Sequence, residues 1–117
     1  MPFHGDARSR SCGSNLKLTL LLDEQGRIAQ VGCRAQACAV GQAAAHIFAV
    51  AAPGQSAGQI AKARTELAEW LSGTGPRPNW PGTVLLDAAR DYPARHGAIL
   101  LAWDAALAAL ASPPQLR

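Results

Sequence analysis

An alternation of apolar and polar positions predicts a β-hairpin in the first third of the chain. The apolar positions are four leucines at every second residue, namely Leu16, Leu18, Leu20 and Leu22. This period of two is typical of a strand with one buried face. Residues 23–26, of sequence Asp-Glu-Gln-Gly, then predict a turn. A return strand is expected from Arg27 to about Arg34.

The return strand carries a cysteine among its apolar positions. Ala29, Val31 and Cys33 fall on one face of the expected strand. Because a free cysteine packs well as a small apolar side chain, we interpret Cys33 as a core residue in preference to a metal ligand.

Beyond Cys38 the apolar spacing changes to the period of a helix. That pattern runs until Pro53 and Gly54, so Cys38 is expected to open the first helix. A second helix is predicted from a Ser56 cap to about residue 72. Residues 73–82 are rich in Gly and Pro and predict a loop, which Trp80 is expected to pin to the body of the protein. A short helix over about 84–90 and a last helix over about 98–111 complete the expected elements.

The order of elements indicates the fold class. Strands come first and helices follow, with no strand-helix-strand alternation. We therefore expect an α+β fold in which an antiparallel sheet, the N-terminal hairpin, is covered on one face by C-terminal helices. The 117 residues fit a single domain over 1–117, with residues 1–10 as a flexible tail.

Composition and charge exclude several kinds of partner. The net charge is +3, but the basic residues are scattered along the chain, which argues against a nucleic-acid stripe. The N-terminus lacks an apolar signal core, and the alanine-rich stretch 43–52 contains His46 and is stopped by Pro53, so we expect no membrane segment and a cytoplasmic protein. In a reducing compartment the three cysteines are expected to be buried, reactive or metal-bound rather than paired in disulfides.

The common catalytic motifs are mostly absent from the sequence. The chain has no phosphate-binding glycine loop, no dinucleotide fingerprint and no His-Glu-x-x-His pair. Only three histidines are present, and His4 falls in the expected tail, while His46 is expected on the surface. A hydrolase is therefore disfavoured.

Two cysteines remain as candidates for chemistry. Cys12 and Cys38 stand just outside the two ends of the predicted hairpin, which would bring them to its open end. At a helix start, unpaired amide groups and the positive end of the dipole favour a thiolate at Cys38. A thiolate serves both as a nucleophile and as a metal ligand.

The segments around these cysteines resemble a known family. They are Cys12-Gly13-Ser14, the leucine-alternating strand with Asp23-Glu24-Gln25-Gly26-Arg27-Ile28, Gln36-Ala37-Cys38-Ala39-Val40-Gly41-Gln42-Ala43, and the run from Tyr92 to Ala105. Together they resemble the U-type scaffold family of iron-sulfur cluster assembly, the NifU N-terminal-like and IscU-like domains. The resemblance covers about residues 11–111.

The resemblance implies a particular ligand set. Such scaffolds gather three cysteines and an aspartate on one surface, where Cys12 matches the first cysteine and Cys38 the second. Ser14 stands where the family has its aspartate, and Ala98 stands at the third cysteine. His96, two residues earlier, could reach the same surface. The implied metal ligands are therefore Cys12, Cys38 and His96, fewer than the four of a complete zinc or two-iron site.

The implied function has three versions. The first is a scaffold that transiently holds iron, an iron-sulfur cluster of the [2Fe-2S] type, or zinc, in a labile site completed by a partner, a second subunit or a small thiol. The second is a zinc-dependent, sulfurtransferase-like acceptor in which Cys38 takes persulfide sulfur. The third is a metal-free scaffold that binds partners or regulates them. The implied partners are a cysteine desulfurase and recipient apo-proteins, with a homo-oligomer as a further option, and the protein is not expected to be an enzyme in the first and third versions.

Overall fold

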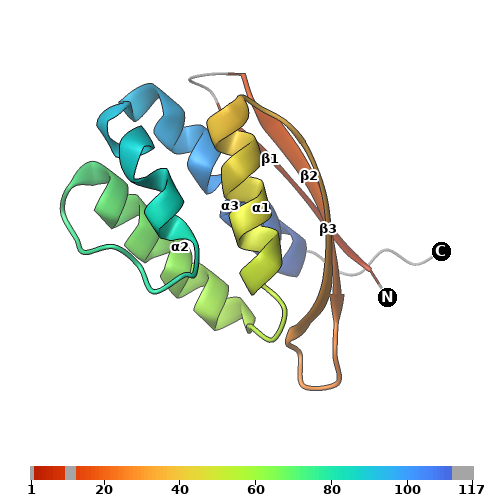
Figure 1. Ribbon diagram of the computed structural model, residues 1–117. Helices are drawn as coiled ribbons and strands as arrows, with labels where there is room; N and C mark the ends of the chain where they lie inside the picture. The colour runs from red at the N-terminus through yellow and green to blue at the C-terminus, as the bar shows by residue number, and fades with distance from the viewer. Residues whose placement is uncertain (1, 10–12, 112–117) are drawn as a thin grey trace.

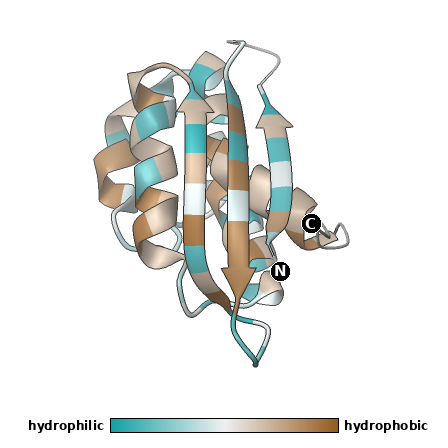
Figure 2. Cartoon of the chain, turned by 90° about the vertical axis from the view of Figure 1, so that its right-hand side faces the viewer, coloured by the Kyte–Doolittle hydropathy of each residue, from teal (hydrophilic) through white to brown (hydrophobic). Residues whose placement is uncertain are grey.

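A computed structural model describes residues 2–9 and 13–111 and shows a three-stranded antiparallel sheet with helices on one face (Figure 1). The strands are β1 (Phe3–Arg8), β2 (Asn15–Leu22) and β3 (Ile28–Gln36), in the order β1-β2-β3. The helices are α1 (Ala39–Ala51), α2 (Ala57–Ser72) and α3 (His96–Ala111), with 3-10 helices η1 (Thr83–Asp91) and η2 (Pro93–Arg95) between α2 and α3. The other face of the sheet is open (Figure 2). The predicted α+β class is confirmed.

The first strand corrects one expectation. Residues 3–8, expected as part of a flexible tail, form β1 along the edge of β2, with Gly5 opposite Leu18. Gly5 also lies directly against α3. A β-carbon added there would collide with the carbonyl oxygen of Ala105 and lie 2.7 Å from the amide nitrogen of Ala109. The segment is ordered by this contact between small residues, which lie a hundred positions apart in the chain.

The hairpin of β2 and β3 contains an irregularity that changes which residues are buried. Leu21 pairs with Gln30 while Leu22 pairs with Ile28, so Ala29 is an extra residue in β3. Such a bulge shifts the alternation by one position. Strict alternation would place Ile28 on the face opposite Val31, but the bulge turns it into the core at 1% exposure.

Helix α3 is the central element of the core. It packs against β1, β2, α1 and α2, and its buried side chains are distributed around the whole helix. The stretch Pro93–Ala111 is long and apolar enough to cross a membrane by length and composition. Contacts with the sheet on one side and helices on the other account for that apolar character.

Three aromatic rings fill the space between α1, α3 and the loop before η1. Phe48 stacks on Trp80 with ring centroids 5.4 Å apart, and Trp103 meets both rings edge-on at 5.2 and 5.3 Å. The indole Nε1 of Trp80 donates a hydrogen bond to the Ile47 carbonyl oxygen at 3.0 Å. Trp80 therefore pins its loop to α1, as the sequence predicted.

Candidate functional site

The open end of the hairpin brings Ser14 and Cys38 to the same end of the molecule. Asn15 and Gln36 form the last pair of the β2-β3 ladder, and the Asn15 Nδ2 donates to Gln36 Oε1 at 3.4 Å. Ser14 directly precedes this pair, and Cys38 follows it by two residues. Cys12 lies outside the described residues.

Cys38 is the N-cap of α1, as predicted. Its backbone is extended (φ −64°, ψ 172°), and its carbonyl accepts the first helical hydrogen bond from the Gln42 amide at 2.9 Å. Its side chain is half-buried and makes no capping hydrogen bond to the residues that the structure describes. The first amide groups of a helix carry the positive end of its dipole. The thiol thus lies beside the unpaired amide groups of the first helical turn.

The first turns of α1 and α3 meet at Gly41. A β-carbon on Gly41 would lie 2.7 Å from the Ala37 β-carbon and 3.3 Å from that of Ala98. Gly41 is three residues beyond Cys38, and Ala98 is the third residue of α3. Ala98, which the resemblance matches to the family's third cysteine, therefore faces the start of the Cys38 helix, but it is 1% exposed and supplies no ligand atom.

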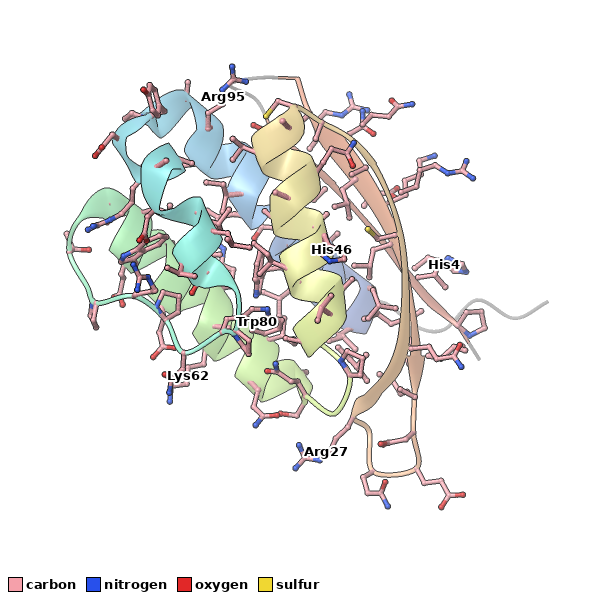
Figure 3. All side chains as sticks on the ribbon, in the orientation of Figure 1. His4, Arg27, His46, Lys62, Trp80 and Arg95 are labelled. Carbon is pink, nitrogen blue, oxygen red and sulfur yellow. The ribbon has the colours of Figure 1, made fainter. Side chains whose placement is uncertain are left out.

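His96, the first residue of α3, is held by a backbone carbonyl. Its Nε2 lies 2.8 Å from the Arg90 carbonyl oxygen. Because a carbonyl oxygen only accepts hydrogen bonds, Nε2 is the donor in this contact, which leaves Nδ1 as the ring nitrogen that a metal could reach. Metal-binding histidines are commonly oriented in this way. Figure 3 shows the neighbouring Arg95 at the end of the molecule where α1 begins.

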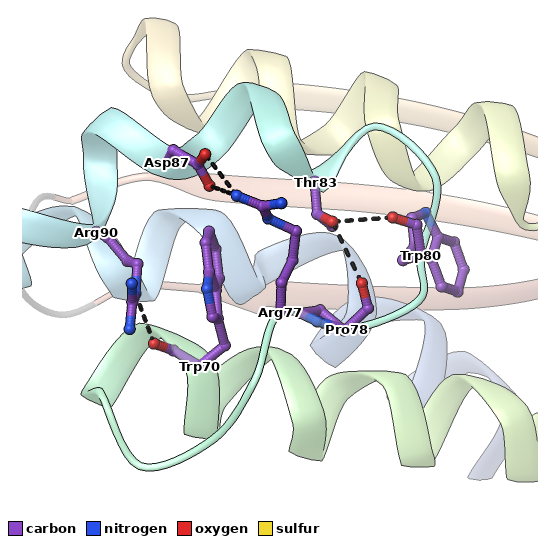
Figure 4. Close-up of polar contacts among 7 residues, drawn as sticks. All are labelled: Trp70, Arg77, Pro78, Trp80, Thr83, Asp87 and Arg90. Carbon is purple, nitrogen blue, oxygen red and sulfur yellow. Dashed lines mark hydrogen bonds and ion pairs between the residues drawn. The ribbon is translucent and has the colours of Figure 1, made fainter.

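The side chain of Arg90 is held against α2 (Figure 4). The Arg90 Nε donates to the Trp70 carbonyl oxygen at 2.9 Å, and its guanidinium lies 5.0 Å from the centre of the Trp70 ring. The guanidinium of Arg77 lies 5.8 Å from the same ring centre and is paired with Asp87. These contacts join α2, the following loop and η1, and they were not visible in the sequence pattern.

The described residues do not form a complete metal site. Among residues 2–9 and 13–111, no group of three or more His, Cys, Asp or Glu side chains could hold a metal ion. Ser14, which the resemblance matches to the family's aspartate, is buried at 4% exposure. Of the expected ligands, the described residues include one thiol, Cys38, and one imidazole, His96, whereas a stable tetrahedral site needs about four donors.

The remaining cysteine does not behave as predicted. Cys33 pairs with Leu18, so it is in phase with the buried side chains of β2, yet it is exposed. The expectation of a core residue is wrong because β3 is an edge strand, and the helices do not cover its full length. Partial burial still raises the pKa of the Cys33 thiol. His46 is exposed, as expected, and His4 lies in β1 with its Nδ1 3.2 Å from Thr19 Oγ1.

Comparison with known proteins identifies the family. The profile of the NifU-like N terminal domain matches residues 2–112. The chain belongs to this family. It is thereby a member of a family of scaffolds for iron-sulfur cluster assembly. No curated protein matches the chain by sequence.

Solved structures show the same fold. A NifU-like protein (N-terminal) from Brucella abortus is 28% identical with a TM-score of 0.84, over 92% of this chain and 76% of that one. A putative iron-sulfur cluster assembly scaffold protein for the SUF system from Fervidobacterium islandicum AW-1 is 22% identical, with a TM-score of 0.81 over 92% and 79% of the two chains. A hypothetical protein is 21% identical, with a TM-score of 0.75 over 93% and 81%.

Proposed function

We propose that this protein is a transient carrier in cytoplasmic iron-sulfur cluster assembly, which holds iron, a [2Fe-2S] cluster or zinc through Cys12 and Cys38. The observation that carries the proposal is the placement of Cys38 as an uncapped helix N-terminus at the open end of the hairpin. Membership of a family of iron-sulfur assembly scaffolds supports the kind of cargo. The cargo is a metal or cluster that arrives and leaves, and it is not a resident cofactor.

The incomplete ligand set favours a labile site. Neither Ser14 nor Ala98 supplies a thiolate or carboxylate, and His96 offers Nδ1 alone. Two thiols and one imidazole leave a position to be filled from outside, by a cysteine desulfurase, a recipient apo-protein, a second copy of the chain or a small thiol. We expect the cargo to be released easily for that reason.

A second function, sulfur acceptance, is favoured by the position of Cys38. A thiolate at the start of α1 would attack the terminal sulfur of a desulfurase persulfide. A new sulfur-sulfur bond forms at Cys38, the bond within the desulfurase persulfide breaks, and the desulfurase cysteine leaves as a thiolate. No external oxidant or reductant is needed, because the sulfane sulfur only changes its carrier.

Anaerobic incubation with iron, sulfide and a cysteine desulfurase distinguishes these functions. Carriage of a cluster gives visible absorption and the corresponding mass in native mass spectrometry. Sulfur acceptance gives mass increments of sulfur alone. Both signals should disappear in Cys38→Ser, whereas the matched variant Cys33→Ser should retain them, because Cys33 is on the exposed edge of the sheet. A colourless protein of unchanged mass that still binds the desulfurase would instead show a metal-free, partner-binding scaffold.

Two further variants test the ligand set. Zinc retained through purification and lost in His96→Ala would make His96 a ligand, and unchanged zinc content would exclude it. The double variant Ser14→Asp with Ala98→Cys restores the residue types of the family and should retain its cluster through gel filtration when the original chain does not. Equal loss of the cluster from the double variant and from the original chain would contradict a site at this end of the fold.

A further inference from the structure

The open face of the sheet carries positive charges on all three strands. Leu16 and Leu18 point into the core, so Lys17 between them, together with its cross-strand partners Asp6 and Arg34, points outward. The outward cations are Arg8 on β1, Lys17 on β2 and Arg34 on β3, all of them exposed. In Figure 3, His4 also extends from this face, away from the helices.

These cations are not neutralised within the described chain. Arg34 lies opposite Lys17, and Lys17 lies opposite Asp6, the single acidic residue of this face among the described residues. The ion pairs of residues 2–9 and 13–111 are Arg64 with Asp104 and Arg77 with Asp87, which involve only the helices and the loop between α2 and η1. The sheet face therefore has an excess of unpaired positive charge.

The same face is hollowed and polar. A depression of about 400 Å³ lies around Gly32, where an added β-carbon would meet no atom within 4 Å, and Lys17, Thr19 and Arg34 are in its lining. A second depression, of about 170 Å³, lies between β1 and β2 beside Arg8. Leu21, near the turn, is the exposed large apolar side chain of this face in the described chain. Burial of apolar surface therefore contributes little to any contact made here.

The charged face is continuous with the thiol end of the molecule. Its last row is formed by Arg8, Asn15 and Gln36, and Cys38 follows Gln36 by two residues. A protein bound to the face would therefore extend to the open end of the hairpin, beside the thiol.

We propose that the open sheet face is a docking surface for an acidic protein that exchanges cargo with Cys38. This inference rests on the proposed function only for the reason why a partner docks. The surface itself is argued from its charges and its shape. Three strands about 4.8 Å apart offer a surface well below the ~800 Å² per partner of a stable interface, so the contact is transient and salt-sensitive. Complementary charge then sets the association rate and the orientation of the partner.

Charge and side-chain type favour a protein over a nucleic acid. Single strands bind to surfaces that combine cations with aromatic platforms, and this face presents no aromatic ring among its described residues beyond the imidazole of His4. Asp6 stands in the row of Lys17 and Arg34, where it would repel a phosphate chain. An acidic protein can place carboxylates on the cations and a donor on Asp6.

Titration of the isotope-labelled protein with poly-L-glutamate, followed by amide NMR, tests the proposal without iron or sulfur. The amide signals of residues on the open face, among them Lys17, Thr19 and Arg34, should move and saturate, and they should return at 300 mM NaCl. Shifts centred on the helices, or none at all, would overturn the docking surface. Because no cargo is present, either result leaves the proposed carriage of iron or sulfur to its own test.

Two lysine variants provide the matched control. Lys17→Glu should weaken binding about tenfold, whereas Lys62→Glu, the same charge change on α2 (Figure 3), should weaken it less than about twofold. Asp6→Asn should tighten binding about twofold. Equal effects of the two lysine variants would show that binding responds only to net charge, which would overturn the proposal. Tighter binding of an oligothymidylate, or of vesicles of anionic lipid, at this face would also overturn it. Thermal melting of each variant confirms that it is folded.

Discussion

Helices α1 and α2 follow one another in the chain but begin in different ways. At α2, Ser56 Oγ accepts from the Gln59 amide at 3.3 Å, and Gln59 Oε1 accepts from the Ser56 amide at 2.8 Å, a complete capping box. At α1, Cys38 occupies the same position and makes no such bond within the described chain. A good cap contributes about 1 kcal/mol of stability. The start of α2 is thus optimised for stability, whereas the start of α1 retains a thiol.

The contrast also shows what holds α1 in place. Its ring at Phe48 is fully buried against Trp80 and Trp103, and its first turn presses on α3 through Gly41. Tertiary packing, rather than capping, fixes the end that carries Cys38. Four substitutions test this view, in order of decreasing effect.

The largest effect is expected inside α1. Phe48→Ala removes a ring with no solvent exposure and should lower the free energy of unfolding by about 3–5 kcal/mol, measured by urea denaturation. Phe48→Leu keeps most of the volume and should lower it by about 1–1.5 kcal/mol. A loss below about 1 kcal/mol in Phe48→Ala would mean that packing does not anchor α1.

Gly41→Ala tests the contact between α1 and α3. The added methyl group would lie 2.7 Å from the Ala37 β-carbon, so we expect a loss of about 1–3 kcal/mol in the free energy of unfolding. Gly58→Ala in the first turn of α2 is the matched control. Its methyl group meets only Ser56 Oγ, at 3.9 Å, and higher helix propensity should stabilise that variant by up to about 1 kcal/mol. Stabilisation by both variants would refute the close contact.

Ser56→Ala removes the cap of α2. The free energy of unfolding should fall by about 1 kcal/mol, because the amide of Gln59 loses its acceptor. Thr65→Ala, on the exposed side of the same helix, should raise it by a few tenths of a kcal/mol, roughly the difference in helix propensity. Thermal or urea denaturation measures both, and sulfur or metal uptake should be unchanged in each.

Cys38→Ser should have the smallest effect on stability, in the opposite direction. Serine is a strong N-cap residue, so the free energy of unfolding should rise by about 0.5–1 kcal/mol while sulfur and metal uptake are lost. Cys38→Ala should lose uptake without the gain in stability. If Cys38→Ser were less stable than the original chain, the Cys38 thiol would itself stabilise the fold, which the comparison of the two helix starts does not predict.

The sequence predicted the elements that depend on local pattern. The leucine alternation predicted β2, and the change of period after Cys38 predicted the start of α1. The prediction failed where distant residues decide. β1 contains Gly5 and Asp6, which have low strand propensity, and it is ordered by contacts with β2 and α3.

The candidate site was predictable in part. The placement of Cys38 followed from its neighbours, whereas the approach of Gly41 to Ala98 and the hold of Arg90 on His96 depend on how helices pack. For Cys33 the alternation predicted the correct face of the strand. It could not predict that the side chain is exposed, because periodicity does not distinguish an edge strand from a covered one. The assignment of Cys12 stays a prediction.

The aromatic cluster behind α1 supplies a spectroscopic reporter. Trp80 and Trp103 have ring centres 5.3 Å apart and planes inclined at 71°, close enough for their electronic transitions to couple. Near-ultraviolet circular dichroism responds to such fixed packing and is lost when side chains become mobile. Trp80 is hydrogen-bonded to α1 and Trp103 lies on α3. This signal can therefore report whether the two helices stay packed together while the protein exchanges partners, without an added label.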